Sequence, residues 1–398
     1  MNAPAASFPT TAMPHDTPPD TPRPTPRLPL PEGSLQGLRV IDLSRVLAGP
    51  YCTQILADHG ADVLKIEPPV GDETRGWGPP FDAQGTASYF HGLNRNKRGC
   101  TMDLTDPAQR EALLAMLADA DVLVENFKTG TMEKWGLGPQ ELTARFPRLV
   151  YARITGFGAD GPLGGLPGYD AAIQALAGLM SVNGEPDSKG GEPLRVGLPV
   201  VDMVTGLNAA LGVSFALIER QRSGRGQYLE VALYDAGLSL LHPHAANHLM
   251  DGRIPGRTGN AHPNICPYDT FATATEKIFL AVGNDKQFAT LCRLIGADDL
   301  PGDERFVSNA QRSRNRVALK ERLEAALARF ECKPLADRLV REGVPCAPIQ
   351  DVAAALADPH TQHRGMVVEL DGYRGVASPI KLGRTPASYR LPPPKRGP

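Results

Sequence analysis

The sequence lacks the patterns of several common protein classes. Its 42 basic and 44 acidic side chains leave a net charge of −2, which gives no reason to expect a nucleic acid or a membrane as partner. No apolar run approaches the roughly 20 residues that a transmembrane helix needs. The six cysteines are scattered, without a CxxC pair. We therefore expect reduced thiols in a cytoplasmic enzyme, and no disulfide framework.

Metal-ligand patterns are equally scarce. His242, His244 and His248, in HPHAANH, are the one metal-like cluster. No acid or cysteine lies at a useful spacing from them. We expect histidines of the core or of an interface there, and no metal site.

The N-terminal segment has few large apolar groups. It is rich in proline and threonine, and cannot bury enough surface to offset its ordering entropy. It also lacks a basic region followed by an apolar stretch, so it is not a secretory signal. Residues 1–35 are therefore predicted to form a disordered, Pro-rich tail.

From Leu38 on, strand-like and helix-like segments alternate. Repeated strand–helix–strand units indicate an α/β fold with a parallel sheet. Such sheets bind ligands at the carboxyl ends of their strands. The predicted strands are 38–44, 61–67, 121–127 and 149–155, and the predicted helices are 48–60, 105–120 (capped by Asp106, with Pro107 at its first position) and 138–146.

A length of 398 residues suggests two domains. We assign 36–224 to a large domain with the parallel sheet. The pattern changes after the SGRG turn and a strand at 227–233, so that 225–330 is predicted to be a smaller α+β domain. Residues 331–398 would return to the large domain, form a hairpin turning at Asp371-Gly372 and end in a loose tail.

The segment GFGADG resembles a dinucleotide-binding fingerprint. Gly156, Gly158 and Gly161 match GxGxxG directly after a predicted strand. The fingerprint requires a helix to start within the glycine turn. The continuation PLGGLPG cannot form one. We therefore do not expect a nicotinamide or flavin cofactor here.

Two acids stand beside glycine-rich loops. Asp202 follows an apolar run, Leu198–Val201, which we interpret as a buried strand, and precedes a long helical segment. Its default role is a helix N-cap. The helix dipole would keep the carboxylate ionised, and such a group can attack a carbonyl carbon. Asp170, preceded by Tyr169, also starts a helix. Together they hint at a site.

Eight segments, in order from about Leu38 to about Arg390, resemble the family III CoA-transferases, the CaiB/BaiF group. They are RVLAGPYCTQILADHGADVLKIEPPVGDETRGW, LNRNKRG, ADVLVENFKTG, GLGPQEL, YARITGFGADGP, GYDAAIQALAGLMSVNGE, PVVDMVTGLNAALGV and GNAHPNICPYDTF. The resemblance implies a Rossmann-like large domain, a small domain and an interlocked homodimer. It implies coenzyme A as a substrate, with no permanently bound cofactor.

The resemblance also implies a mechanism. Asp202 would attack an acyl-CoA thioester to give an anhydride, and CoA thiolate would convert the anhydride to an aspartyl thioester. A carboxylic acid would then take over CoA. Asp170 would orient or polarise the reacting groups. The stretch with Gly259 and Asn260 would be the water-excluding lid, although it lacks the run of glycines found in formyl-CoA transferase.

Tyr169 bears on the choice between branches of the family. The related alpha-methylacyl-CoA racemase has a histidine base at that position. A tyrosine, with an ordinary pKa of about 10, is a poor base at neutral pH. Transfer is therefore favoured over racemisation. A racemase-like isomerase and a non-catalytic CoA-binding protein remain the alternatives.

Further residues follow from the resemblance. Leu47 replaces a catalytic-site glutamine of formyl-CoA transferase, which argues against formyl-CoA and oxalate as the substrate pair. Arg45 could hold the distal carboxylate of a dicarboxylate acceptor, with succinyl-CoA as donor. Arg75 or Arg98 could replace a missing phosphate contact. The nucleotide contacts would fall on Val46, Leu47, Met102, Thr105, Asn126, Phe127 and Lys134.

Overall fold

The computed structural model describes residues 32–396. Up to Pro31, the predicted tail lies outside the described residues. The prediction is wrong for its last residues, because Leu35 packs against the core and its N–H donates to His59 O at 2.9 Å.

The main sheet is parallel throughout and has the strand order β3-β2-β1-β4-β5-β6. This is the order of a Rossmann sheet, which confirms the predicted α/β class. β3 is absent from the predicted strands because its sequence, KRGCT, has no apolar alternation. The strands are β1 (Arg39–Asp42), β2 (Asp62–Glu67), β3 (Lys97–Thr101), β4 (Val122–Glu125), β5 (Val150–Thr155) and β6 (Tyr228–Ala232).

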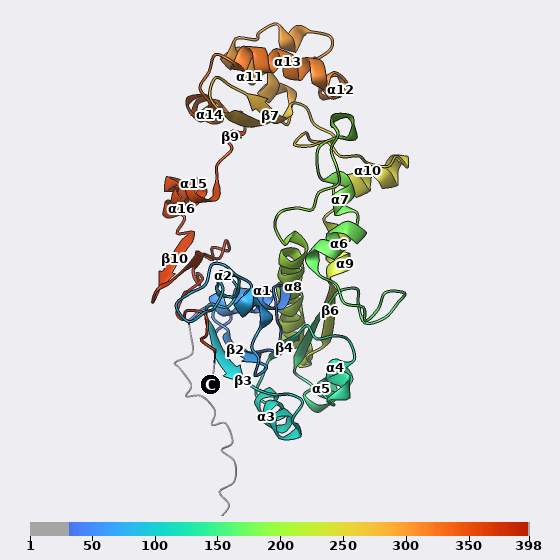
Figure 1. The fold of residues 1–398 in the computed structure, drawn as a ribbon, viewed down its shortest axis with the longest axis vertical. Helices are drawn as coiled ribbons and strands as arrows, with labels where there is room; N and C mark the ends of the chain where they lie inside the picture. The colour runs from blue at the N-terminus through green and yellow to red at the C-terminus, as the bar shows by residue number, and fades with distance from the viewer. Residues whose placement is uncertain (1–31, 397–398) are drawn as a thin grey trace, which may run out of the picture. The chain divides into compact units, whose positions relative to one another are not determined.

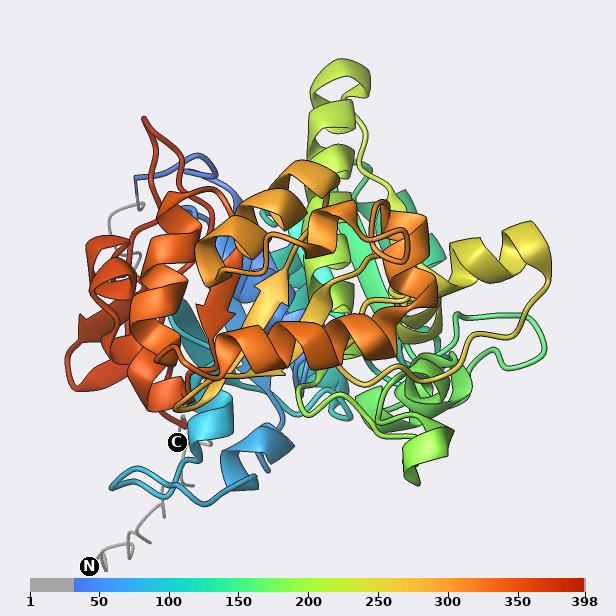
Figure 2. The same cartoon turned by 90° about the horizontal axis from the view of Figure 1, so that it is seen from above.

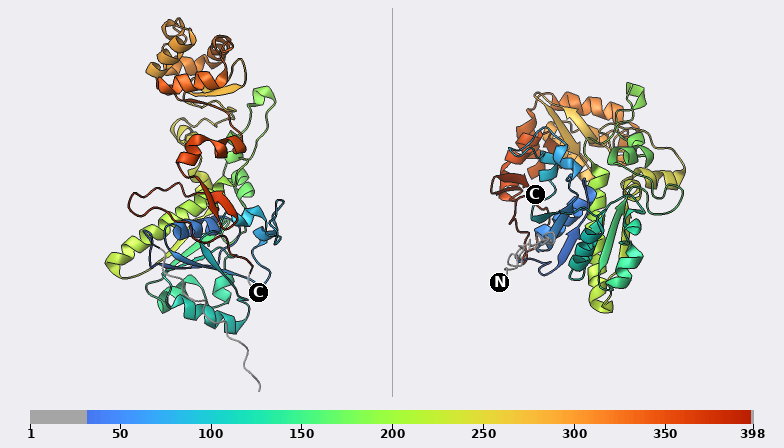
Figure 3. Two further views of the ribbon diagram at one scale, coloured as in Figure 1. Left: turned by 90° about the vertical axis from the view of Figure 1, so that its left-hand side faces the viewer. Right: turned by 60° about the horizontal axis from the view of Figure 1, so that its bottom comes forward.

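Each face of this sheet is covered by its own hydrophobic layer. Alternate strand residues point to opposite faces, so that Val122 joins one buried cluster and Leu123 the other. The long helices α1 and α8 lie together on one face, and α3 and α5 lie on the other (Figures 1 and 3). The bounds are α1 (Ala48–Asp58), α6 (Asp170–Leu176), α8 (Val200–Ser223) and α9 (Leu233–Ser239) for the first layer, and α3 (Pro107–Leu117) and α5 (Pro139–Arg145) for the second.

Local signals predicted several boundaries. Asp106 caps α3 by accepting a hydrogen bond from Ala108 N at 2.9 Å, and Pro107 opens the helix. Between Thr155 and Asp170 the chain forms turns without a helix, so the glycine motif there is not a dinucleotide fingerprint. The shorter helices are α2 (Ser88–His91), α4 (Thr131–Lys134), α7 (Leu179–Val182), α10 (His244–Asp251) and the 3-10 helices Glu73–Gly76, Asp187–Lys189 and Leu300–Gly302.

A second, antiparallel sheet has the order β7-β8-β9 and its own hydrophobic core. Helices α11, α13 and α14 contribute to this core, and the view from above looks down onto the helices that lie over the sheet (Figure 2). Its elements are β7 (Tyr268–Ala272), β8 (Lys277–Ala281), β9 (Cys346–Pro348), α11 (Asp285–Ile295), α12 (Asn309–Arg314), α13 (Arg316–Leu327) and α14 (Cys332–Arg341). The predicted limits 225 and 330 therefore cut across both sheets, because β6 pairs with the main sheet and β9 with the small one.

The C-terminal part contains α15 (Val352–Ala357), α16 (Pro359–His363) and a hairpin of β10 (Val367–Leu370) and β11 (Tyr373–Val376). The hairpin turns at Asp371 and Gly372, with φ of 45° and 80°, which confirms the predicted turn. The segment 391–398 was predicted to be a loose tail, and this is wrong for its described part, 391–396, where Pro394 O accepts from Arg75 and Arg396 donates to Pro69 O. Asn96 Oδ1 accepts from the backbone N–H groups of both Arg390 and Leu391.

Helix α8 corrects the expectation about apolar runs. By length and composition it would qualify as a membrane span, with a mean hydropathy of 1.6, but half of that window is buried inside the protein. Buried core helices pass the same test.

All six cysteines carry free thiols, as their scattered spacing predicted.

The close approach of α8 to α1 depends on Gly206. A Cβ added there would lie 2.6 Å from Ala48 O and 3.1 Å from the Tyr51 ring. We expect Gly206→Ala to lower the free energy of unfolding by about 2 kcal/mol through overpacking, as measured by urea denaturation. Gly212→Ala, on the same helix, is the matched control. Only the tip of Leu229 lies near its Cβ, at 3.3 Å, and alanine favours the helix by about 1 kcal/mol. Equal losses in both variants would contradict this account.

Candidate active site

A cavity of about 190 Å³ opens at the carboxyl ends of β1, β4 and β5. The strand order reverses between β1 and β4, and open α/β sheets bind ligands at such a switch point. The cavity is lined by Arg45, Val46, Leu47, Ala48, Glu73, Asn126, Phe127, Lys128, Thr129, Ile154, Thr155, Gly156, Gly165, Leu166, Pro167, Gly168, Tyr169, Asp202 and Leu233.

Reciprocal hydrogen bonds fix the two loops at the switch point. Asn126 Oδ1 accepts from Arg45 N at 2.8 Å, and Asn126 Nδ2 donates to Arg45 O at 2.7 Å. Val46 has a φ of 68°, which is a strained conformation for a β-branched residue. Buried side chains hold the segment after β1 in place, because Lys65 Nζ donates to both Ser44 O (2.8 Å) and Asp72 Oδ2 (3.0 Å). The cavity wall is thus set before any ligand arrives.

Asp202 lines the cavity from the first turn of α8. The strand predicted at Leu198–Val201 is wrong, because the helix begins at Val200 and Leu198 is 69% exposed. Proline at position 199 suits a helix start better than a buried strand. The predicted N-cap role is wrong too, since Pro199 is the N-cap residue and Asp202 is the third residue of the helix.

Asp170 opens α6 but caps α8. Its Oδ2 accepts from Val201 N at 2.8 Å and from Asp202 N at 3.0 Å. Pro199 has no side-chain acceptor for these N–H groups, and Asp170 replaces it. The two predicted acids therefore meet, and one carboxylate fixes the backbone of the other.

Burial and the neighbouring charge change the chemistry of Asp202. Burial, with the charge of Asp170 as a second cause, raises the pKa of Asp202 from its ordinary value of 3.8 to about 7. The expectation that the helix dipole keeps this acid fully ionised is therefore wrong at neutral pH. Desolvation outweighs the dipole here.

Tyr89 was missed by sequence reasoning. Burial and then the charges of Asp202 and Asp170 raise the pKa of Tyr89 to about 12, so the phenol keeps its proton beside the two acids. Its ring meets Trp77 edge-on at 5.2 Å. No local pattern marks Tyr89, which lies on the short helix α2 and does not line the cavity but feels the charges of both acids. Tyr169, the N-cap residue of α6, lines the cavity and is 57% exposed.

Some of the predicted coenzyme contacts line the cavity and others lie away from it. Val46, Leu47, Asn126 and Phe127 line the cavity, as does Arg45. Met102 is buried in the core, whereas Thr105 and Lys134 are exposed and do not line the cavity. The prediction for Arg75 is wrong. Its guanidinium is buried and donates to Glu67 from Nε (2.8 Å) and Nη2 (2.7 Å). Arg98 pairs with Asp62.

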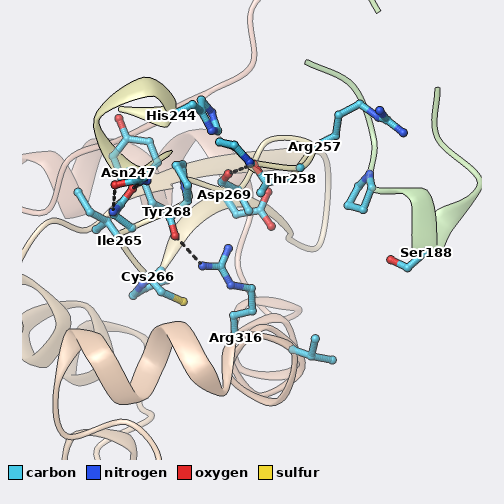
Figure 4. A pocket seen from close by; sticks show the side chains of 18 of the residues that line it. Ser188, His244, Asn247, Arg257, Thr258, Ile265, Cys266, Tyr268, Asp269 and Arg316 are labelled. Atoms are coloured by element: carbon cyan, nitrogen blue, oxygen red, sulfur yellow. Dashed lines mark hydrogen bonds between the residues drawn. The ribbon is translucent and has the colours of Figure 1, made fainter. Parts of the chain in front are cut away.

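A larger cavity, of about 770 Å³, lies elsewhere (Figure 4). His244, Tyr268 and Arg316 are among its lining residues. Arg316 already donates to the carbonyls of His262 and Pro263. Gly259 and Asn260, the predicted lid, belong to the loop beside this cavity and do not line the smaller one. The smaller cavity is the candidate active site because Asp202, whose backbone N–H is bonded to Asp170, lines it.

Within residues 32–396, no group of three or more His, Cys, Asp or Glu could hold a metal ion. In the HPHAANH segment, which contains His242, His244 and His248, the Nδ1 atom of His248 lies 2.9 Å from Arg253 O.

The fold and site define an α/β enzyme with a buried carboxylate at the switch point of a Rossmann sheet. Residues 35–398 match the family model described as CoA-transferase family III. A succinate–glutarate CoA-transferase from Agrobacterium fabrum is 41% identical over 91% of this chain and 93% of its own. An acetyl-CoA:oxalate CoA-transferase from Acetobacter aceti is 40% identical over 88% and 90%.

The solved structures agree. A CaiB/BaiF family protein from Brucella suis superposes with a TM-score of 0.81 at 42% identity, covering 92% of this chain and 96% of that one. The chain therefore belongs to CoA-transferase family III. It is an enzyme that transfers coenzyme A from an acyl-CoA to a carboxylic acid.

The raised pKa of Asp202 predicts a pH-dependent cost to stability. The folded state binds the proton more tightly than the unfolded state, so the contribution of Asp202 is favourable below pH 4 and is lost as pH rises to about 7. Relative to the parent, Asp202→Asn should gain up to about 4 kcal/mol in the free energy of unfolding between pH 4 and pH 8. Urea denaturation at several pH values measures this. A difference that does not change with pH would contradict the assignment.

Proposed function

We propose that Asp202 is the nucleophile and that the acceptor is a dicarboxylic acid. The observation that carries this proposal is the position of Asp202, which is buried, lines the switch-point cavity and has a pKa of about 7. A carboxylate with a raised pKa is a stronger nucleophile and is still partly ionised at neutral pH.

The reaction proceeds in four balanced steps. The Asp202 carboxylate attacks the thioester carbonyl, forming an acyl-aspartyl anhydride and releasing CoA thiolate. The thiolate attacks the aspartyl carbonyl, giving an aspartyl-CoA thioester and freeing the donor acid. The acceptor carboxylate attacks this thioester, forming a second anhydride and releasing the thiolate again. The thiolate finally attacks the acceptor's carbonyl, which yields the new acyl-CoA and restores Asp202.

A neighbouring group supports these steps. Asp170 accepts from the two backbone N–H groups that lead into Asp202, and so keeps the nucleophile's backbone fixed while its side chain changes bonding.

Arg45 supports a dicarboxylate acceptor. Its Nη1 lies 4.0 Å from Glu73 Oε1, and its Nε has no hydrogen-bond partner among residues 32–396. A second carboxylate in the cavity could bond this guanidinium. The two relatives described above are named for glutarate and oxalate, which are both dicarboxylates. Succinyl-CoA is the donor that we propose.

The alternatives have less support. A racemase needs a second base across the α-carbon, and Tyr169 offers a phenol where a base would be required. A CoA-binding protein without catalysis would have no use for a buried acid pair at the cavity, since burying like charges costs stability.

We also propose a cytoplasmic homodimer. Four residues of α8 spaced by three or four positions are 43–60% exposed and form one apolar face: Leu207, Leu211, Phe215 and Ile218. An apolar stripe of this kind is expected to be covered by protein, and we assign it to the second copy. Sedimentation of the protein at micromolar concentration tests the assignment.

Asp202→Asn tests the nucleophile. The amide keeps the shape of the side chain and the backbone hydrogen bonds to Asp170, but it removes the attacking oxygen anion. We expect at least a 1,000-fold loss of CoA transfer, on the order seen when a nucleophile is removed. With the parent enzyme and an acyl-CoA, hydroxylamine should attack the activated aspartyl carbonyl, release the donor acid or CoA and leave a hydroxamate on Asp202, as detected by peptide mass spectrometry. Transfer at the parent's rate by the variant would contradict the proposal.

Arg45→Ala tests the acceptor site. We expect KM for a dicarboxylate acceptor to rise about 10-fold or more, while a monocarboxylate acceptor is used as before. Arg225→Ala is the matched control, because Arg225 is exposed in the turn between α8 and β6. If both acceptors are affected equally, the distal carboxylate does not bind at Arg45.

A further inference from the structure

Gln174 is a fully buried amide one helical turn after Asp170. Its Nε2 donates to Asp170 Oδ1 at 2.5 Å and to Leu198 O at 3.3 Å. Its Oε1 accepts from Val196 N at 2.8 Å. Both ends of the amide are therefore engaged, and they join α6 to the segment that leads into α8.

The two oxygens of Asp170 are thereby given different partners. Oδ1 accepts from Gln174, whereas Oδ2 accepts from Val201 N and Asp202 N. A carboxylate bonded on both oxygens cannot rotate about its terminal bond without losing partners. Gln174 consequently fixes the orientation from which Asp170 holds the start of α8.

The approach to α8 needs this support. Residues 196–198 precede the helix without belonging to a strand or helix, and the N-cap residue Pro199 has no side-chain acceptor. Gln174 bonds this segment at Val196 and Leu198, on both sides of Gly197. The backbone on the N-terminal side of Asp202 is therefore held by one amide and one carboxylate.

We propose that Gln174 is a positioning residue of the transfer reaction, which sets the direction of Asp202 through Asp170. This inference rests on the proposed function, in which Asp202 is the nucleophile. Gln174 does not line the cavity, so it acts on the reaction through the acid that it orients.

Gln174→Met tests the inference, because methionine preserves length and burial but removes both the donor and the acceptor. We expect kcat to fall at least 10-fold, since small displacements of a reacting group are costly. KM for the acyl-CoA should stay within about twofold, because the cavity lining is unchanged. Formation of the hydroxamate on Asp202 with hydroxylamine should slow in parallel with kcat.

The matched control is Gln54→Met. Gln54 is also a buried helical glutamine whose amide joins two segments, through Gly92 O and Arg95 N. It does not line the cavity. We expect Gln54→Met to lower Tm about as much as Gln174→Met does, but to leave kcat unchanged. A kcat within twofold of the parent in Gln174→Met, or an equal loss of kcat in both variants, overturns the inference.

Gln174→Glu covers the case in which the methionine variant does not fold. It keeps the shape and the acceptor for Val196 N. An acid buried beside Asp170 can donate to it only while protonated, so kcat relative to the parent should fall as pH rises, with KM retained. A kcat equal to the parent's at every pH also overturns the inference. If the parent enzyme itself gives no hydroxamate on Asp202, the proposed function fails. If the parent and Gln174→Met form this hydroxamate at the same rate, only the role of Gln174 fails.

Discussion

The carboxylate of Asp170 bonds the first free N–H groups of α8, and the geometry of the site depends on this contact. A proline at the N-cap leaves those donors without a local acceptor, so a side chain from another helix must supply one. That solution brings a second negative charge next to Asp202. Burial, and then this charge, raises the pKa of Asp202 to about 7. The contact that builds the helix start therefore also contributes to the reactivity of the acid.

The order of the strands determines where the cavity lies, and hydrogen bonds between the loops hold the cavity wall in place. A cavity forms where the strand order reverses, because the loops after β1 and β4 diverge there. Asn126 joins these loops by two reciprocal hydrogen bonds, and Asp72 and Lys65 hold the strained segment around Val46 from below. A transfer reaction with hydrolysable intermediates requires such a preformed wall, because a rearrangement that admits water would lead to hydrolysis of the anhydride or thioester.

Much of the fold could be predicted from local patterns. The apolar runs of β1, β2, β4 and β5 and the Asp-Pro start of α3 carry period and capping signals. β3 carries neither, and its place is set by pairing with β2. The run before Asp202 has the composition of a strand but is the start of a helix, because tertiary contacts with Asp170 and Gln174 outweigh propensity there. Resemblance identified Asp202 and Asp170, whereas Tyr89 and the pairing of Arg75 with Glu67 depend on contacts between distant segments that no spacing reveals.

The end of the chain covers an open edge of the main sheet. Among residues 32–396, β3 pairs only with β2, and an unpaired edge strand is a template for association with another strand. Leu391 O accepts from Asn96 N at 2.8 Å, and Pro394 packs against Gly99, in the middle of β3. Prolines 392–394 have no N–H groups, so this segment shields the edge without becoming a seventh strand. This covered edge is therefore closed to strand addition, and self-association through the main sheet would have to use the opposite edge, at β6, or the helices that cover its faces.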